Sequence, residues 1–220
     1  IVLEEAAKAG VKKLVLSSSA AIYGDNPVTP KVETMFPEPK SPYAITKLDG
    51  EYYCKLFVDE KRIQTACLRY FNVFGPRQDP ASQYAAAVPI FIRRALRHEP
   101  ITIYGDGEQT RDFIFVKDIA AANVFFATQS PATGVFNVAY GKKITINELC
   151  RAICELTGSK SEIKHALERA GDVKHSLAGV EKIRAAGFTT QGNLSDGLRA
   201  TIEFFQRQQI SGQGAQSCNL

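Results

Sequence analysis

Apolar runs and amphipathic stretches alternate along the chain, and this alternation predicts strands that alternate with helices. Residues 1–9 have an amphipathic helical pattern that ends at Gly10. The run Leu14–Leu16 follows at once and is apolar at successive positions, as is typical of a strand buried on both faces of a parallel sheet. Further strands are expected at 65–69, 101–105, 110–116 and 135–139. The pattern predicts an α/β fold built on a parallel sheet.

Capping signals mark several helices between these strands. Ser41 and Pro42 combine a hydroxyl N-cap with proline at the first helical position, which predicts a helix from Pro42 to about Lys61. Thr145 and Glu148 have the spacing of a capping box, and the helix they open is expected to end before Gly158. Helices are also expected at 85–98, at 117–129 and around Leu198, Ile202 and Phe205, with a flexible tail over 209–220.

Composition and charge narrow the class of protein. The 220 residues are 45% apolar and 23% charged, with a net charge of +4, and the basic residues are scattered, which argues against a nucleic-acid partner. The five cysteines contain no C-x-x-C pair, so we expect free thiols and no metal site. No apolar run reaches membrane-spanning length and no signal peptide is recognisable. These features favour a cytoplasmic protein without a membrane partner.

Residues whose side chains can take part in catalysis or binding follow the predicted strands, where a doubly wound sheet binds its ligands. They are Ser17–Ser19 after the first strand, Tyr43 and Lys47 in the first turns of the Pro42 helix, and 69–72 after the next strand. Tyr43 and Lys47 share one helix face, so the ammonium favours the phenolate form, which can remove a proton from an alcohol. Taken singly, such a Tyr–Lys pair arises by chance and serines at strand ends are common turn residues.

The amino-acid sequences of five segments, and their order along the chain, point to a family. SSSAAIYGD, SPYAITK, LRYFNVFGPRQDP, YGDGEQTRDFIFVKDIA and RAGDVKHS occur in the order found in the extended short-chain dehydrogenase/reductase family. Over residues 1–208 the chain resembles the NAD-dependent nucleotide-sugar epimerases of that family, of the UDP-glucose/UDP-N-acetylglucosamine 4-epimerase type. The family's glycine-rich phosphate loop and its acidic ribose-binding residue are not found. We therefore expect an N-terminally truncated chain that by itself binds NAD weakly or not at all and lacks turnover.

The resemblance implies a domain organisation. Residues 1–80 would be the remainder of a Rossmann-like NAD-binding domain with a doubly wound parallel sheet. Residues 81–208 would combine a small α/β substrate-binding lobe, about 81–115 and 160–208, with a returning Rossmann segment, about 116–158.

The resemblance also implies roles for individual residues. Tyr43 would be the catalytic base, Lys47 its charged partner and a ligand of the nicotinamide ribose, and Ser19 the hydroxyl that bridges Tyr43 and the sugar 4-oxygen. Phe71 would lie beside the nicotinamide. The implied UDP-sugar contacts are Asn72 at the diphosphate, Thr102 and Tyr104 at the uracil, Arg111, Arg169 and Asp172 in a diphosphate clamp and a ribose contact, and Ser176 at the sugar. For Arg111 the alternative is an ion pair with Asp112 or Asp118.

Two further positions bear on which reaction is catalysed. Resembling dehydratases carry an Asp-Glu pair where this chain has Ala20 and Ala21, and the glutamate of decarboxylating relatives is also missing. Methyl groups cannot transfer protons, so 4-epimerisation is favoured. The small Ser176 leaves room for an N-acetyl group, and the segment around Tyr84 resembles N-acetylhexosamine enzymes, so UDP-N-acetylglucosamine/UDP-N-acetylgalactosamine is the favoured pair.

Several alternatives stay open at this point. The chain could belong to a UDP-glucose 4-epimerase, a UDP-glucuronate 4-epimerase or a nucleotide-sugar reductase. From another class, it could be a non-catalytic cofactor-sensing protein on the same fold.

The helix that starts at Pro42 carries a second apolar face. Its residues are Ile45, Leu48, Tyr52, Leu56, Tyr53 and Phe57. One helix with two apolar faces needs a second cover, which predicts a homodimer through this helix. The resembling family also pairs through a four-helix bundle. The alternative is burial of this face within the chain itself.

Overall fold

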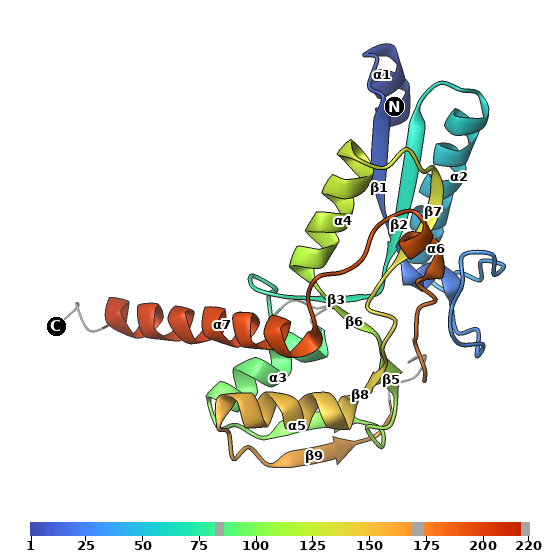
Figure 1. The fold of residues 1–220 in the computed structure, drawn as a ribbon. Helices are drawn as coiled ribbons and strands as arrows, with labels where there is room; N and C mark the ends of the chain where they lie inside the picture. Colours follow the sequence, from blue (N-terminus) through green and yellow to red (C-terminus); the bar gives the residue numbers. More distant parts are fainter. Residues whose placement is uncertain (82–85, 169–173, 217–220) are drawn as a thin grey trace. The chain divides into compact units, whose positions relative to one another are not determined.

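The structure, a computed structural model, describes residues 1–81, 86–168 and 174–216 (Figure 1). The chain forms two compact units, each assembled from three segments. Unit 1 consists of residues 1–73, 111–143 and 173–191, and unit 2 of residues 74–110, 144–172 and 192–220. The predicted domain boundaries remain a prediction; by its contacts, the segment 144–158 lies in unit 2.

Unit 1 is built on a three-stranded parallel sheet in the order β1-β2-β7. Its strands are β1 (Lys13–Ser19), β2 (Gln64–Tyr70) and β7 (Gly134–Val138). Ser18 pairs with Arg69 and Ser19 with Tyr70, so the serine triplet and the end of β2 lie at the same edge of the sheet. The parallel sheet that the apolar runs predict is therefore confirmed.

Helices α2 (Pro42–Asp59) and α4 (Val116–Thr128) pack on β1 and β2. The side chain of Ser18 bonds to a residue of α2, whereas that of its neighbour Ser17 bonds to Tyr70, which in turn bonds to a residue of α4. Because successive strand residues point to opposite faces, the two helices cover opposite faces of the sheet (Figure 1). Helix α1 (Val2–Lys8) precedes β1, and α6 (Glu181–Ala185) packs on β7.

Local sequence explains how α2 is set against β1. Ser41 Oγ accepts the Ala44 amide at 3.2 Å and Pro42 occupies the first turn, which confirms the predicted start. Gly50 lies where α2 approaches the sheet: a Cβ at this position would be 3.0 Å from a methyl group of Leu16. The missing side chain therefore allows the helix to lie close to the strand.

The short helix η1 (Ala20–Tyr23) follows β1 directly. It ends at Gly24, which has a φ of +61° and faces the main-chain oxygen of Glu38 at a position where a Cβ would be only 2.1 Å away. Only glycine fits there, so the SSSAAIYGD segment has a fixed exit from the sheet.

Unit 2 contains three helices and a two-stranded parallel sheet in its described part. The helices are α3 (Ala87–Leu96), α5 (Ile146–Thr157) and α7 (Leu194–Gln216), and the strands are β4 (Ile101–Tyr104) and β9 (Ile163–Ala166). Helices α3 and α7 both contact α5. The capping box of Thr145 and Glu148 and the left-handed Gly158 at the other end of α5 are both present, as predicted.

Two sequence-based expectations need correction, and one strand was not predicted. The single strand expected at 110–116 is two short strands, β5 (Thr110–Arg111) and β6 (Phe113–Phe115), which pair with β8 (Ile144–Thr145) and β3 (Asn72–Phe74). It breaks at Asp112, whose buried carboxylate accepts main-chain N–H groups from other segments.

The second correction concerns the flexible tail expected over 209–220. Helix α7 continues to Gln216, and residues 217–220 lie outside the described part. Leu198, Ile202 and Phe205 are buried and anchor the earlier turns of α7, from which a helix propagates at little further cost. Strand β9 is the element that was not predicted. All four of its residues are exposed and show no alternating pattern.

Cys54, Cys67, Cys150 and Cys154 are free thiols. A hydrogen bond with Cys54, together with burial, raises the pKa of the Cys67 thiol, so Cys67 is held in its uncharged form. Within the described residues, no helix is long and apolar enough to cross a membrane. The same residues contain no group of three or more His, Cys, Asp or Glu side chains placed to hold a metal ion.

Candidate active site

Tyr43 and Lys47 lie in the first turns of α2, at the carboxyl end of β1. Lys47 donates a hydrogen bond from Nζ to the main-chain oxygen of Ser17 at 2.9 Å. The same Nζ lies 5.5 Å from the centre of the Tyr43 ring, and 56% of Tyr43 is exposed. A positively charged group therefore lies beside an accessible phenol, and a phenol in that position can exchange a proton with a hydroxyl group of a ligand.

Ser19 is the last residue of β1 and the N-cap of η1. Its Oγ accepts the Ala21 amide at 3.2 Å, which leaves the hydroxyl proton available for donation. The side chain is half-buried. It lies two residues beyond Ser17, whose main-chain oxygen binds Lys47, so the serine triplet supplies both the anchor of the lysine and a hydroxyl at the same strand end.

The opposite face of the sheet carries a series of hydrogen bonds that the sequence analysis missed. Ser17 Oγ lies 3.0 Å from the Tyr70 hydroxyl, which donates to Asn123 Oδ1 at 2.9 Å. Asn123 Nδ2 in turn donates to the main-chain oxygen of Ile119 at 2.8 Å. The signal available in the sequence was Asn123, a polar residue in the middle of the otherwise apolar part of α4. These bonds fix the β1 residue that accepts the bond from Lys47.

A buried ion pair lies directly beneath the site and was also missed. Arg69 donates to Glu51 from Nε at 2.9 Å and from Nη2 at 2.6 Å, and Ser18 Oγ donates to the same carboxylate at 2.5 Å. Both charged side chains are only 4% exposed. Burial opposes the charge of Arg69, but the hydrogen bonds to Glu51 outweigh it, and the pKa of Arg69 is raised.

The guanidinium of Arg69 lies over the ring of Tyr23, 4.7 Å from its centre. Burial raises the pKa of Tyr23, so its hydroxyl stays protonated and donates to Asn137 Oδ1 at 2.6 Å. Phe71 is buried, with its ring centre 6.2 Å from that of Tyr23, and its amide bonds to Val138. Asn72, the next residue, is exposed.

The remaining predicted substrate residues belong to both units. Arg111 is half-buried and contacts the main-chain oxygen of Lys174 at 3.5 Å. Ser176 is half-buried and lies two residues before Ala178, which forms a bridge with Lys31. Thr102 and Tyr104 lie on β4 in unit 2, with Tyr104 exposed. Arg169, Asp172 and Tyr84 lie outside the described residues.

Both aspartates considered as ion-pair partners of Arg111 have other hydrogen bonds. Asp112 accepts the amides of Tyr140, Gly141 and Ala178 at 3.0–3.2 Å. Asp118 accepts the Tyr140 hydroxyl and the Gln191 amide, each at 2.8 Å. Burial raises the pKa of Asp112 to about 6, against the effect of its main-chain hydrogen bonds.

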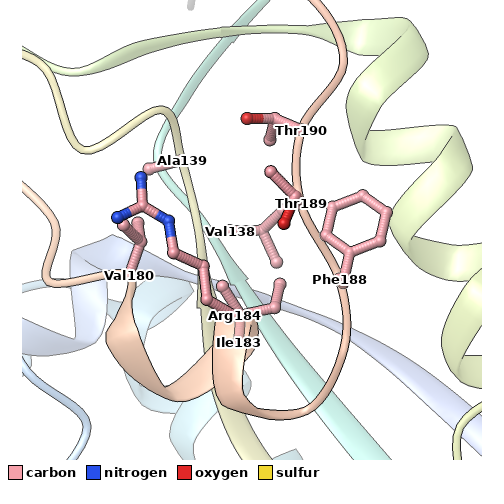
Figure 2. Close-up of a pocket in the computed structure, with 8 residues that line it drawn as sticks. All are labelled: Val138, Ala139, Val180, Ile183, Arg184, Phe188, Thr189 and Thr190. Carbon is pink, nitrogen blue, oxygen red and sulfur yellow. The ribbon is translucent and has the colours of Figure 1, made fainter.

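A small pocket lies at the carboxyl end of β7 (Figure 2). In Figure 2 the Arg184 side chain extends toward Ala139. The pocket has room for roughly one water-sized group, so a nucleotide does not fit. It is lined by Val138, Ala139, Val180, Ile183, Arg184, Phe188, Thr189 and Thr190, none of which the sequence analysis singled out.

Comparison with known proteins identifies the family of this chain. The sequence pattern of the NAD dependent epimerase/dehydratase family matches residues 1–139, which is more than half of the chain. The chain belongs to this family. The resemblance seen in the sequence motifs is thereby confirmed.

Individual relatives are similar over almost the whole chain. The UDP-N-acetylglucosamine 4-epimerase from Methanobrevibacter ruminantium, solved in complex with UDP-N-acetylmuramic acid, is 44% identical with a TM-score of 0.91; the match covers 94% of this chain and 67% of that one. The Thermus thermophilus UDP-glucose 4-epimerase, solved with NAD, is 35% identical with a TM-score of 0.83, over 93% of this chain and 67% of that one.

A curated relative, the UDP-glucose 4-epimerase of Mycolicibacterium smegmatis, is 36% identical over 211 residues, 94% of this chain and 66% of its own length. The chain thus spans about two thirds of the length of the proteins it matches.

The residues present fit a bound NAD at its nicotinamide end. Lys47 carries three N–H groups, of which one bonds to Ser17, so donors remain for ribose hydroxyls. The exposed phenol of Tyr43 lies beside it. Tyr43 and Lys47 would hold this part of the cofactor, and the position of Phe71 beside the nicotinamide stays a prediction.

Proposed function

We propose that the full-length protein catalyses NAD-dependent 4-epimerisation of a UDP-sugar. The observation that carries the proposal is the placement of Tyr43, Lys47 and the Ser17–Ser19 strand end at one edge of a parallel sheet. Membership of the NAD dependent epimerase/dehydratase family supports it. The relatives named above as UDP-sugar 4-epimerases support the reaction type.

In this mechanism the chain's own residues move a proton and hold the sugar. Tyr43, as phenolate, removes the proton of the sugar 4-hydroxyl, while the adjacent Lys47 ammonium stabilises the negative charge before the transfer. A bound NAD, held at its nicotinamide ribose by Tyr43 and Lys47, would supply the reversible hydride acceptor for C4. Ser19 donates a hydrogen bond to the 4-oxygen and keeps it near Tyr43. Once the 4-keto sugar has rotated to present its opposite face, the protonated Tyr43 returns its proton to the 4-oxygen. Tyr43 is thereby restored to its starting form.

The absence of a second acid and base favours epimerisation over dehydration within this family. Ala20 and Ala21 follow Ser19 in η1 and offer no proton-transferring group. Arg111, Arg169 and Asp172 are assigned to the diphosphate and ribose, Asn72 to the diphosphate, and Thr102 and Tyr104 to the uracil. Two arginine forks suit a diphosphate because each can bind phosphate oxygens bidentately.

The substrate pair we propose is UDP-N-acetylglucosamine and UDP-N-acetylgalactosamine, with UDP-glucose and UDP-galactose as a side activity. Ser176 is small and half-buried, which leaves space for a 2-acetamido group. The similarity to a UDP-N-acetylglucosamine 4-epimerase is in line with this choice, whereas the similarities to UDP-glucose 4-epimerases favour the plain hexoses.

The proposal includes a homodimer through α2 and a cytoplasmic location. Ile45, Tyr52, Tyr53 and Leu56 are each more than half exposed on α2, which supports a second copy as their cover. Phe57, which the sequence analysis placed on this surface, is instead buried, with Arg62 stacked over its ring at 4.3 Å. The four cysteines in the described part of the chain are free thiols, which is compatible with a reducing compartment.

The test is an assay of the full-length protein with the four UDP-sugars, read by separating each epimer pair. We expect interconversion of the N-acetylated pair, and slower interconversion of the plain pair. A non-catalytic cofactor-sensing protein would bind NAD without interconverting any of them, and a reductase would consume reduced cofactor in proportion to product. Either outcome would refute the proposed epimerase.

A further inference from the structure

Glu51, which forms the buried ion pair with Arg69, lies on the same face of α2 as Tyr43 and Lys47. Tyr43, Lys47 and Glu51 follow one another at intervals of four residues on α2, so they lie on one stripe of the helix. Tyr43 is exposed and Lys47 is half-buried, whereas Glu51 is buried. One stripe therefore carries the proposed chemistry at one end and a buried carboxylate at the other.

The carboxylate of Glu51 joins three elements at a single point. It accepts hydrogen bonds from Ser18 on β1 and from Arg69 on β2, while itself belonging to α2. Ser18 and Arg69 are also direct partners in the β1–β2 register. Strand and helix therefore cannot slide past each other at this point without breaking a buried, charge-assisted hydrogen bond.

Ser18 lies between the two serines that matter for the site. The main-chain oxygen of Ser17 binds Lys47 at 2.9 Å, and Ser19 provides the hydroxyl at the strand end. The close approach at Gly50, next to Glu51, keeps the helix near Leu16 of the same strand. Holding Ser18 thus fixes the position of both neighbours relative to Lys47.

A stabilising role alone does not account for this arrangement. Buried ion pairs lose much of their attraction to desolvation and are frequently replaceable by apolar residues without loss of stability. Within the described residues, Nη1 of Arg69 has no hydrogen-bond partner, so the pair also carries an unsatisfied donor.

We propose that Glu51 and Arg69 are positioning residues of the active site, which hold Tyr43 and Lys47 in register with the Ser17–Ser19 strand end through Ser18. This inference rests on the proposed function for its catalytic consequence, because the geometry to be held is that of the proton transfer. Neither side chain contacts the reacting atoms. Their effect is expected in turnover rather than in substrate binding.

The main test replaces both charges together in the full-length protein, as the double variant Glu51→Met/Arg69→Met. This avoids leaving one buried charge unpaired, which would itself destabilise the fold. We expect kcat to fall about 100-fold, as for a misplaced catalytic group, with KM changed less than about threefold. The acid limb of the kcat profile should move to higher pH, because Lys47 no longer favours the phenolate as strongly.

Two conservative variants cover the case in which the double variant does not fold. Ser18→Ala removes only the bond to β1, and Arg69→Lys keeps the charge but loses the bidentate fork. Both should lower kcat and shift the acid limb in the same direction, by less than the double variant.

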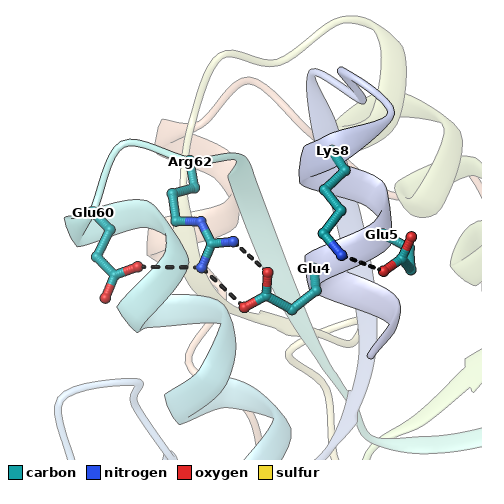
Figure 3. Close-up of polar contacts among 5 residues, drawn as sticks. All are labelled: Glu4, Glu5, Lys8, Glu60 and Arg62. Atoms are coloured by element: carbon teal, nitrogen blue, oxygen red, sulfur yellow. Dashed lines mark hydrogen bonds and ion pairs between the residues drawn. The ribbon is translucent and has the colours of Figure 1, made fainter.

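The matched control is the exposed ion pair at the other end of α2 (Figure 3). Arg62 lies between Glu60 and Glu4, with Nη1 3.1 Å from Glu4 Oε1, and the Arg62 and Glu4 side chains are 35% and 45% exposed. The double variant Glu4→Met/Arg62→Met removes an ion pair from the same helix–strand region and should leave kcat and the pH profile unchanged.

A second measurement separates this inference from the proposed function. Hydrogen exchange of the full-length protein should become faster in the segments 17–23 and 43–47 of the double variant, and not in the control. If the wild type interconverts no UDP-sugar, the proposed function fails, and exchange alone decides whether the pair positions Tyr43 and Lys47. Unchanged exchange in both segments would overturn the positioning role. A fall in kcat that is accompanied by a comparable rise in KM, without a shift of the acid limb, would overturn it as well.

Discussion

The main-chain oxygen of Ser17 accepts a hydrogen bond of 2.9 Å from Nζ of Lys47, although the two residues are 30 positions apart in the sequence. This bond ties the first turns of α2 to the end of β1. It directs the ammonium group toward the strand end and leaves its other N–H groups for ligands. The acceptor of Lys47 is therefore a main-chain oxygen of the neighbouring strand, and replacing the Ser17 side chain does not delete that acceptor atom.

Lys47→Met should lower kcat/KM of the full-length enzyme about 100-fold or more, because it removes the charge that favours the Tyr43 phenolate. The amount of NAD that copurifies with the protein should also fall, since the ribose loses a donor. The matched control is Lys55→Met on the same helix, an exposed lysine paired with Asp59. Equal losses in both variants would assign the effect to the helix rather than to Lys47.

Tyr43→Phe should lower kcat by about 100- to 10,000-fold, the usual contribution of general acid–base catalysis, with UDP-sugar affinity nearly unchanged. Tyr53→Phe is the control, because Tyr53 lies on the same helix and is 54% exposed against 56% for Tyr43. Steady-state kinetics on both variants measure the difference. A fall in kcat of less than about tenfold would show that Tyr43 is not the base.

Much of unit 1 could be predicted because its signals are local. Leu14–Leu16 are apolar on successive positions because α2 and α4 cover both faces of β1, and Ser41 with Pro42 fixes the start of α2 close to Tyr43 and Lys47. The four-residue spacing of Tyr43 and Lys47 was enough to place both on one face of that helix.

The features that could not be predicted depend on contacts between distant segments. Glu51 and Arg69 are charged residues, which normally indicate a solvated surface, and their burial depends on Ser18 from a third element. Strand β9 has four exposed residues and exists because it pairs with β4. The break at Asp112 depends on amides of Tyr140, Gly141 and Ala178. None of these partners lies within the sequence window that a local pattern covers.

Asp112 should make unfolding depend on pH in an unusual direction for a carboxylate. Its pKa is raised from 3.8 to about 6 by burial, so the folded state binds the proton more tightly than the unfolded state. The contribution of Asp112 to the unfolding free energy is therefore larger below pH 4 than above pH 6, by roughly 3 kcal/mol.

Asp112→Asn does not titrate, so the wild type should gain stability relative to this variant as the pH falls from 7 to 4. Chemical denaturation of both proteins at several pH values measures the difference. Asp106→Asn, at an exposed turn residue, is the control and should show no such trend. A wild type that instead loses stability relative to Asp112→Asn over this range would show that the main-chain N–H groups outweigh burial.

Charged substitutions on the exposed face of α2 should convert the proposed homodimer into monomers. Tyr52 and Leu56 are each 53% exposed and one helical turn apart. Tyr52→Glu/Leu56→Glu would bury two carboxylates in an apolar interface, which is strongly unfavourable. Light scattering at micromolar concentration measures the mass, with Val124→Glu on α4, at a residue of similar exposure, as the control. A full-length wild type that is already monomeric would refute the dimer.

Ser176→Tyr should change which UDP-sugars are turned over. Ser176 is half-buried and is followed by Leu177 and Gly179, which bond through their main chains to Lys31. This anchoring limits how far the segment can move away from a larger side chain. A phenol ring at position 176 would therefore compete with a 2-acetamido group for the same space, at a cost of about 1–3 kcal/mol in a packed pocket.

The full-length wild type and Ser176→Tyr should be assayed with both substrate pairs. At about 1–3 kcal/mol, kcat/KM for the N-acetylated pair should fall about 5- to 150-fold relative to the plain pair. Ser176→Ala is the control: it keeps the space and removes only the hydroxyl, so the preference should change little unless that hydroxyl binds the acetamide. If tyrosine at this position left the ratio of the two activities unchanged, the sugar would be selected elsewhere, because a ring of that size cannot share the site with an acetamide.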